Sequence, residues 1–69
     1  MANMSMIHKL ASNNVYVDGV NKKLCVVEYE GNKVKRLYPL KEETSHTMWV
    51  EHPIFLKTTN DGDVEIESY

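Results

Sequence analysis

Cysteine, proline and glycine are scarce in this 69-residue chain, which holds one, two and three of them. A single cysteine excludes an internal disulfide framework and a zinc site built from cysteines. Alanine occurs only twice and no run of about 18 apolar residues is present, so we expect little helix and no membrane-spanning segment. The chain is also far too short for a (β/α)8 barrel or a doubly wound dinucleotide fold.

Apolar residues make up 42% of the chain, and β-branched and aromatic types are prominent among them. These residues fit a pleated, half-buried surface, so we expect one small all-β domain spanning residues 1–69. A chain of this length buries only about 60% of the surface that its unfolded form exposes. Either the strands are well paired or a second copy of the chain completes so thin a core, and because of the second option we expect a homodimer.

Turn signals divide the chain into five or six short strands, which we expect to form an antiparallel meander, as an open sheet or a small barrel. Asp18-Gly19 is a tight-turn signal, since glycine accepts a positive φ without steric cost. Residues 41–45 are expected to form one helical turn or a loop. Pro53 either begins a strand or lies on a sheet edge. The segments with strand-like composition are residues 6–10, 15–17, 24–30, 33–38, 54–58 and 64–68, and residues 47–50 form a further apolar segment.

The most strongly patterned segment is the hairpin over residues 24–38. A type II′ turn at Gly31-Asn32 places Glu30 opposite Lys33. The same register places Glu28 opposite Lys35 and Val26 opposite Leu37 on that face. The residues expected on the other, apolar face are Cys25, Val27, Tyr29, Val34, Arg36 and Tyr38.

A second hairpin is expected near the end of the chain, around a three-residue loop at 60–62 with Gly62 in a left-handed conformation. Apolar and charged partners then separate onto two faces. The expected cross-strand pairs are Thr58 with Val64, Leu56 with Ile66, Ile54 with Ser68, and Lys57 with Glu65.

One family resemblance covers residues 14–40. Asn-Val-Tyr-Val-Asp-Gly begins at Asn14, Cys-Val-Val-Glu-Tyr-Glu-Gly-Asn-Lys-Val begins at Cys25, and Pro39-Leu40 follows. This pattern resembles the small N-terminal β-subdomain of amidohydrolase-type metal-dependent hydrolases, in which two similar strands, a glycine turn and a third strand precede the catalytic barrel. The resemblance implies a strand order and no activity, because the barrel and its His-x-His metal motif are absent here.

The single cysteine and the three histidines are the obvious candidates for chemistry. Neutral imidazole binds zinc or nickel, but no pair of His8, His46 and His52 has the spacing that puts two rings on one face of a strand or helix. Cys25 is expected to be a small buried hydrophobe rather than a nucleophile. We therefore assign no catalytic, cofactor-binding or metal residue, and expect no cofactor.

Two groups of residues are candidates for binding. Trp49, Met48 and Phe55 form the densest apolar segment, and tryptophan often dominates protein interfaces, so these three are the candidate interface. Arg36, Tyr38 and Lys35 are the candidate contact for an anion or a nucleic acid, because a guanidinium grips phosphate and tyrosine stacks on bases. The acidic residues Asp61, Asp63, Glu65 and Glu67 are expected to form a solvated face.

These observations favour a non-catalytic β domain that acts through protein–protein contact, as a homodimer or with an unknown protein partner. The alternative is a small β-barrel that binds single-stranded nucleic acid weakly. The net charge of −2 disfavours the alternative, since nucleic-acid binders usually show a basic footprint. No enzyme activity and no membrane contact are expected, and the single thiol suits a reducing compartment, so we expect a cytoplasmic protein.

Overall fold

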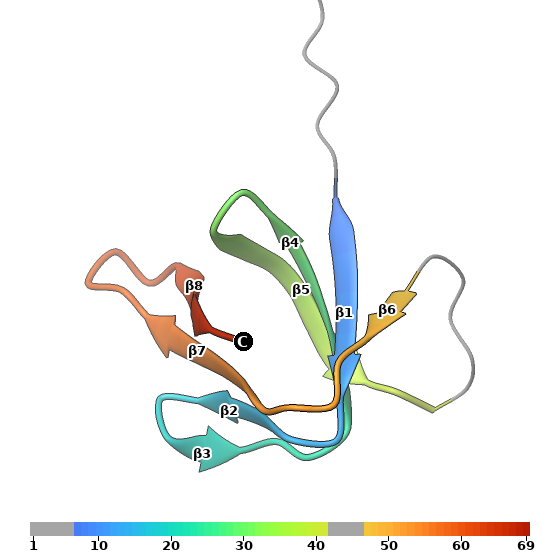
Figure 1. Cartoon of the computed structure of the whole chain (residues 1–69). Coiled ribbons are helices and arrows are strands. Elements are labelled where there is room, and N and C mark those ends of the chain that lie inside the picture. Colours follow the sequence, from blue (N-terminus) through green and yellow to red (C-terminus); the bar gives the residue numbers. More distant parts are fainter. Residues whose placement is uncertain (1–6, 42–46) are drawn as a thin grey trace, which may run out of the picture.

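A computed structural model describes residues 7–41 and 47–69 of the chain. Within these ranges all regular structure is β-strand, which confirms the expected all-β class (Figure 1). There are eight strands rather than five or six: β1 His8–Ser12, β2 Val15–Val17, β3 Val20–Asn21, β4 Cys25–Glu30, β5 Lys33–Pro39, β6 Thr47–Trp49, β7 Ile54–Thr58 and β8 Val64–Ser68.

The strands form one mixed sheet in the order β3-β2-β7-β8-β5-β4-β1-β6. Five of the neighbouring pairs are antiparallel, but β1 pairs with β6 and β2 pairs with β7 in parallel. The sheet is open, with β3 and β6 at its two ends. The expected all-β class is therefore right, but the expected antiparallel meander is not, because the sheet is mixed and its strands do not follow one another in sequence order.

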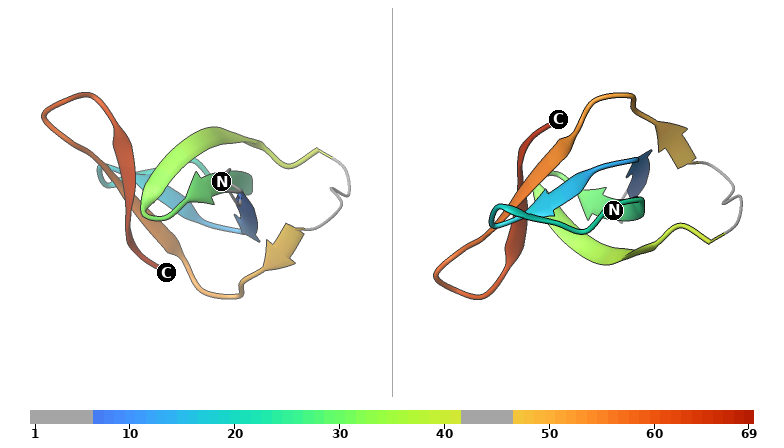
Figure 2. Two further views of the ribbon diagram at one scale, coloured as in Figure 1. Left: turned by 90° about the horizontal axis from the view of Figure 1, so that it is seen from above. Right: turned by 90° about the horizontal axis from the view of Figure 1, so that it is seen from below.

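The two parallel pairings form one continuous, bent contact between residues 9–17 and residues 47–56, which we call the seam. β1 runs on into β2 and β6 runs on into β7, and the two bent segments lie side by side (Figure 1). Val50 N–H donates to Ala11 O at 2.9 Å, and Ile54 N–H donates to Asn14 O at 3.0 Å, so the pairing continues through both bends. The chain therefore links β1 and β6, at one end of the sheet, directly to β2 and β7, near its other end. The sheet curls strongly when seen from above or below (Figure 2).

The core lies inside this curl. Its buried members come from five different strands and are Leu10, Val15, Cys25, Val27, Ile54, Leu56 and Ile66. Each strand contributes alternate residues, as the two-residue period of a strand requires. The expected separation of apolar and charged faces in β7 and β8 is confirmed, since Leu56 pairs with Ile66 and Lys57 pairs with Glu65.

The three glycine turns occur where the sequence predicts them. Asp18 and Gly19 both have positive φ, at 51° and 85°, which is the requirement of a type I′ turn. Gly31 has a φ of 62° while Asn32 does not have positive φ, which agrees with the type II′ turn. Gly62 has a φ of 90° and occupies the expected left-handed position in the last loop.

The register of the β4–β5 hairpin is right near its turn and wrong beyond it. Glu30 pairs with Lys33 as predicted, but a bulge then shifts the pairing so that Glu28 faces Arg36 instead of Lys35. Val26 faces Tyr38 rather than Leu37, and Cys25 faces Pro39. The last residue of β8 shows a similar shift, because Ser68 pairs with Phe55 rather than with Ile54.

The cause of the first shift is the odd spacing of two apolar residues in β5. Val34 and Leu37 are three residues apart, so a regular strand would direct them to opposite faces. The extra residue of the bulge, Lys35, allows both to pack against the core. The prediction for residues 41–45 lies outside the described residues except at Lys41.

Candidate interaction surface

The β6 strand forms one end of the sheet and presents large apolar side chains to solvent. Among the described residues its only strand neighbour is β1. Met48 is 64% exposed and Trp49 is 47% exposed, whereas their partners on β1, Leu10 and Ala11, are buried. Residues 47–50 carry no charge. An uncharged edge strand is a template for pairing with another chain.

A row of apolar residues crosses the outer face of the sheet from this edge. Trp49 of β6 pairs with Ala11 of β1. Ala11 also pairs with Val26 of β4, and Val26 in turn pairs with Tyr38 of β5. Directly paired residues place their side chains on the same face. Ala11 and Val26 are 1% and 0% exposed although they lie on the face opposite to the core cluster. We call these four residues the outer row.

The candidate anion contact belongs to this outer face and not to the apolar inner face. The bulge turns Arg36 outward, where it is exposed and its Cζ lies 5.1 Å from the centre of the Tyr38 ring. Tyr38 donates a hydrogen bond of 2.5 Å from its hydroxyl to Glu28 Oε2. The bond to this carboxylate raises the pKa of the Tyr38 phenol, because it favours the protonated form. The expectation that Arg36 and Tyr38 line the apolar face is therefore wrong.

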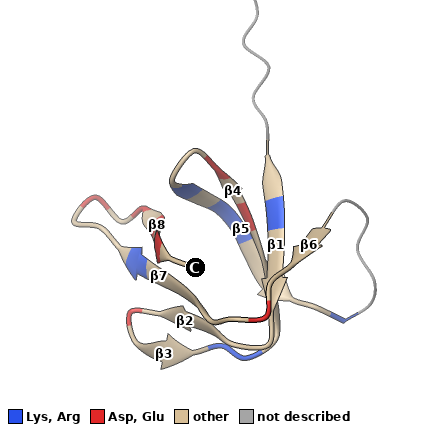
Figure 3. Ribbon diagram, viewed as in Figure 1, with Lys and Arg blue, Asp and Glu red and all other residues tan. Residues whose placement is uncertain are grey.

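The lysines of β5 lie beside carboxylates. Lys33 Nζ is 3.5 Å from Asp63 Oδ2, and Lys35 Nζ is 3.8 Å from Glu30 Oε1. All four side chains are substantially exposed, so each pair contributes at most about 1 kcal/mol. The ribbon shows the basic positions of β5, the strand between β4 and β8, and the acidic positions of these two neighbours (Figure 3). The positive charge of Lys33 and Lys35 is therefore partly offset by neighbouring carboxylates.

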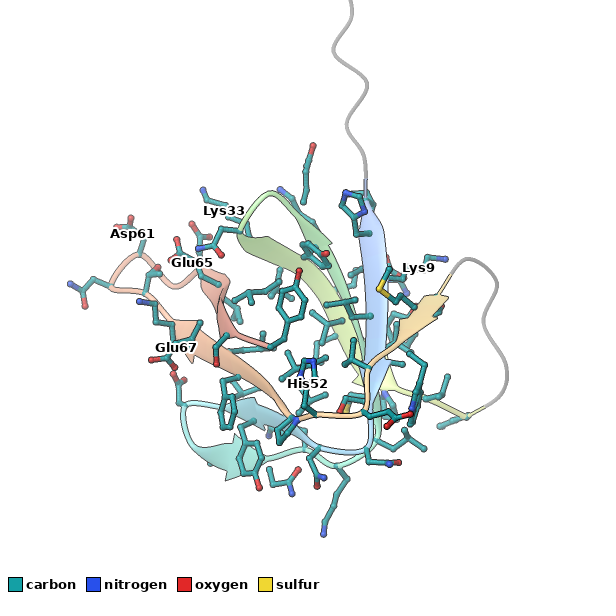
Figure 4. The ribbon with its side chains drawn as sticks, viewed as in Figure 1. Lys9, Lys33, His52, Asp61, Glu65 and Glu67 are labelled. Carbon is teal, nitrogen blue, oxygen red and sulfur yellow. The ribbon has the colours of Figure 1, made fainter. Side chains whose placement is uncertain are left out.

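The acidic residues near the end of the chain lie outside the core. Glu65 and Glu67 lie on β8, and Asp61 and Asp63 lie in the loop that precedes it (Figure 4). Lys33 of β5 is paired in register with Glu65, the one such pair between β5 and β8. Asp63 and Glu65 therefore place negative charge beside Lys33, where β5 meets β8.

The three candidate interface residues do not form one patch. Trp49 and Met48 are consecutive in β6, so their side chains leave opposite faces of the strand. Phe55 lies on β7 and stacks on Tyr16 of β2, with ring centres 5.2 Å apart and planes at 16°. Only Trp49 joins the outer row.

The two described histidines belong to an aromatic row on the inner side of the curl. The ring of His8 contacts Tyr29 at 5.3 Å, Tyr29 contacts Tyr69 at 6.4 Å, and Tyr69 stacks on His52 at 6.4 Å. Burial, and then the hydrogen bond to Tyr69, raises the pKa of Tyr29. His52 lies in the bend between β6 and β7 (Figure 4). His46 lies outside the described residues, within which no three His, Cys, Asp or Glu side chains are grouped to hold a metal ion.

Cys25 is buried at the start of β4, and its Sγ donates a weak hydrogen bond to Lys22 O at 3.3 Å. Burial raises the pKa of its thiol, and the nearby charge of Lys22 lowers it by less. A thiol with a raised pKa carries little of the reactive thiolate at neutral pH.

Two long-range polar contacts that the sequence does not predict tie distant parts of the sheet together. Ser12 is buried and its hydroxyl donates to His52 O at 2.8 Å, which ties the bend after β1 to the bend before β7. Asp18 accepts hydrogen bonds from Thr58 N–H at 2.8 Å and from Thr58 Oγ1 at 2.7 Å, forty residues away. These two bonds lower the pKa of the Asp18 carboxyl, the hydroxyl having the larger effect. No local pattern predicts either contact, since the two partners lie forty residues apart in sequence.

Comparison with known proteins leaves the surface to be interpreted by its own chemistry. No protein-family model matches the chain, and neither a curated protein nor a solved structure resembles it closely enough to be compared. None of the described residues belongs to a helix long and apolar enough to cross a bilayer.

Proposed function

We propose that the chain is a non-catalytic β domain that acts through protein–protein contact, as a homodimer that associates through the β6 edge. The observation that carries this proposal is the exposure of Met48 and Trp49 on an uncharged strand at the end of the sheet. Edge strands that do not pair are usually protected by charge, proline or extreme shortness. The other end of the sheet, β3, has only two residues and is followed directly by Lys22 and Lys23.

The thin core supports the same proposal. Only nine apolar residues of the described chain are buried, while six large hydrophobic side chains besides Trp49 are exposed. Burying Met48 and Trp49 against a second chain would remove apolar surface from water at about 25 cal/mol per Å². A cytoplasmic location is part of this proposal, because the buried thiol of Cys25 has no disulfide partner.

Nucleic-acid binding through Lys35, Arg36 and Tyr38 is the alternative function. Its support is the guanidinium of Arg36 stacked on Tyr38 at the outer face, since such stacks also bind bases. Against it, Lys33 and Lys35 have acidic neighbours within 4 Å. Binding of single-stranded oligonucleotides that falls steeply with salt and is lost in Arg36→Ala would favour this alternative.

The test of the proposed function is the mass of the untagged protein in solution, by native mass spectrometry and by light scattering. We expect a dimer that Met48→Lys converts to a folded monomer, because lysine on an edge strand opposes pairing. Val20→Lys is the matched control: Val20 is 56% exposed on the opposite end of the sheet, and this variant should remain a dimer. A wild-type protein that is monomeric throughout the accessible concentrations contradicts the proposal.

A further inference from the structure

The hydrogen bonds of β6 show which of its backbone groups face the open edge. Val50 N–H donates to Ala11 O, so the backbone groups of Val50 are directed toward β1. Successive residues of a strand direct their N–H and C=O to opposite sides. Trp49, the preceding residue, therefore directs its N–H and C=O away from β1, toward the edge of the sheet at which no other described strand lies.

The charges near β6 bear on which partner this edge accepts. In a twofold-symmetric contact each residue lies close to its own copy, so a charge near the axis would oppose a like charge. Residues 47–50 carry no charge, and the first charge after them is Glu51. Pairing of two identical strands requires an edge without charge near the axis, whereas pairing with a different protein does not. The β6 edge meets this requirement.

We propose that two copies pair through antiparallel β6 strands, with the twofold axis beside Trp49. This inference rests on the proposed homodimer and specifies its register. Trp49 and the partner's Trp49 then exchange both N–H···O=C bonds, in the hydrogen-bonded type of antiparallel pair. Met48 lies opposite the partner's Val50, which makes an apolar pair on the other face.

This register is favoured because it makes the outer row continuous across the dimer. Tyr38, Val26, Ala11 and Trp49 cross four strands of one copy. The axis beside Trp49 joins this row end to end with the same row of the partner. An axis beside Met48 would instead place each Trp49 opposite the partner's Thr47 and interrupt the row. Glu51 lies opposite the partner's Thr47 in the proposed register, so no like charges are directly paired.

Disulfide trapping tests the register. Met48→Cys and Val50→Cys are made separately on a Cys25→Ala background, so that each chain has one thiol. Directly opposed residues of a non-hydrogen-bonded pair have Cα atoms about 4.5 Å apart, within disulfide range, whereas Met48 and its own copy would be about 8 Å apart and outside it. We expect a cross-linked heterodimer when the two variants are mixed and oxidised, and no cross-linked dimer from Met48→Cys alone.

The outcomes separate this inference from the proposed function. Cross-linking of Met48→Cys with itself would place the axis beside residue 48 and overturn the register. A dimer in solution that forms no cross-link in either experiment would leave the homodimer standing and overturn the register. A monomeric protein would overturn both.

Tryptophan fluorescence provides a readout that does not depend on cross-linking. Trp49 is the only tryptophan and is 47% exposed in the single chain. Pairing beside the axis removes it from water, so its emission should shift to shorter wavelength as the protein concentration rises. The shift should be absent in Met48→Lys and retained in Val20→Lys. An emission maximum that is constant across the measured dimerisation contradicts an axis beside Trp49.

Discussion

Val26 offers a direct test of whether the outer face is packed. It is 0% exposed, as is Val27, but the two lie on opposite faces of β4, and only Val27 belongs to the core cluster. Replacing either valine with alanine removes two buried methyl groups. At about 0.8 kcal/mol for each buried carbon and with the added cost of the cavity, each substitution should lower the free energy of unfolding by about 2 kcal/mol.

Val20→Ala is the control for this comparison. Val20 is also a strand residue, so the loss of β-propensity is similar, but it is 56% exposed. We expect its effect to stay within about 0.5 kcal/mol. A domain of this length is stable by about 3–10 kcal/mol, so the larger loss is measurable without unfolding the protein.

Urea unfolding followed by far-UV circular dichroism measures the three variants. The protein concentration is kept constant, because association with a second chain would add to the apparent stability. We expect Val26→Ala to resemble Val27→Ala. If Val26→Ala instead resembles Val20→Ala, the outer face is solvated and the outer row does not exist as a packed layer.

Three further predictions concern single residues. Gly62→Val should lower the free energy of unfolding by about 1 kcal/mol or more, because φ is 90° at this position. An added Cβ meets no atom within 4 Å, so the loss comes from backbone strain alone. A neutral result in urea unfolding would mean that the loop is wrongly assigned. The pKa of Asp18 lies below its ordinary value of 3.8, so the bonds from Thr58 stabilise the fold fully above that pH. This stabilisation is lost as the pH falls through the lowered pKa, so the difference in unfolding free energy between the wild type and Asp18→Ala should shrink in acid. A difference independent of pH would count against the bonds. Cys25 should react with a thiol reagent slowly in the native protein and rapidly in urea, since it is buried and its pKa is raised; equal rates would show that the site is open.

The turns could be predicted from the sequence because their signals are local. Asp18-Gly19, Gly31 and Gly62 each mark a backbone conformation that few other residues adopt, and each has positive φ in the structure. The pairs next to these turns, such as Glu30 with Lys33 and Thr58 with Val64, follow from turn geometry alone.

The pairings farther from the turns could not be predicted in the same way. The β-bulge at Lys35 does have a sequence signal, which is the odd spacing of Val34 and Leu37, but using it requires knowing that both side chains face the core. The parallel seam has no local signal, because nothing near Ala11 specifies Trp49 as its partner. Partner choice over such separations depends on the whole core.

The candidate interaction surface could likewise be predicted only in part from the sequence. Exposure of Met48 and Trp49 agrees with an interface role that the sequence suggested by residue type. The outer row was not foreseeable, since Trp49 and Tyr38 lie in one row only through the registers of three strand pairs. A one-residue error in the β4–β5 register reverses the face assigned to Arg36 and Tyr38.

The bent parallel seam also determines how the chain reaches its fold. Ala11 and Trp49 are separated by 38 residues, so forming the seam closes a long loop at an entropic cost of about 3 kcal/mol, against about 1 kcal/mol for a three-residue hairpin loop. The hairpins β4–β5 and β7–β8 have local contacts and can form independently of the seam. Folding is therefore expected to be limited by formation of the seam. Until it forms, the edge of β1 that pairs with β6 and the edge of β7 that pairs with β2 are exposed to other unfolded chains.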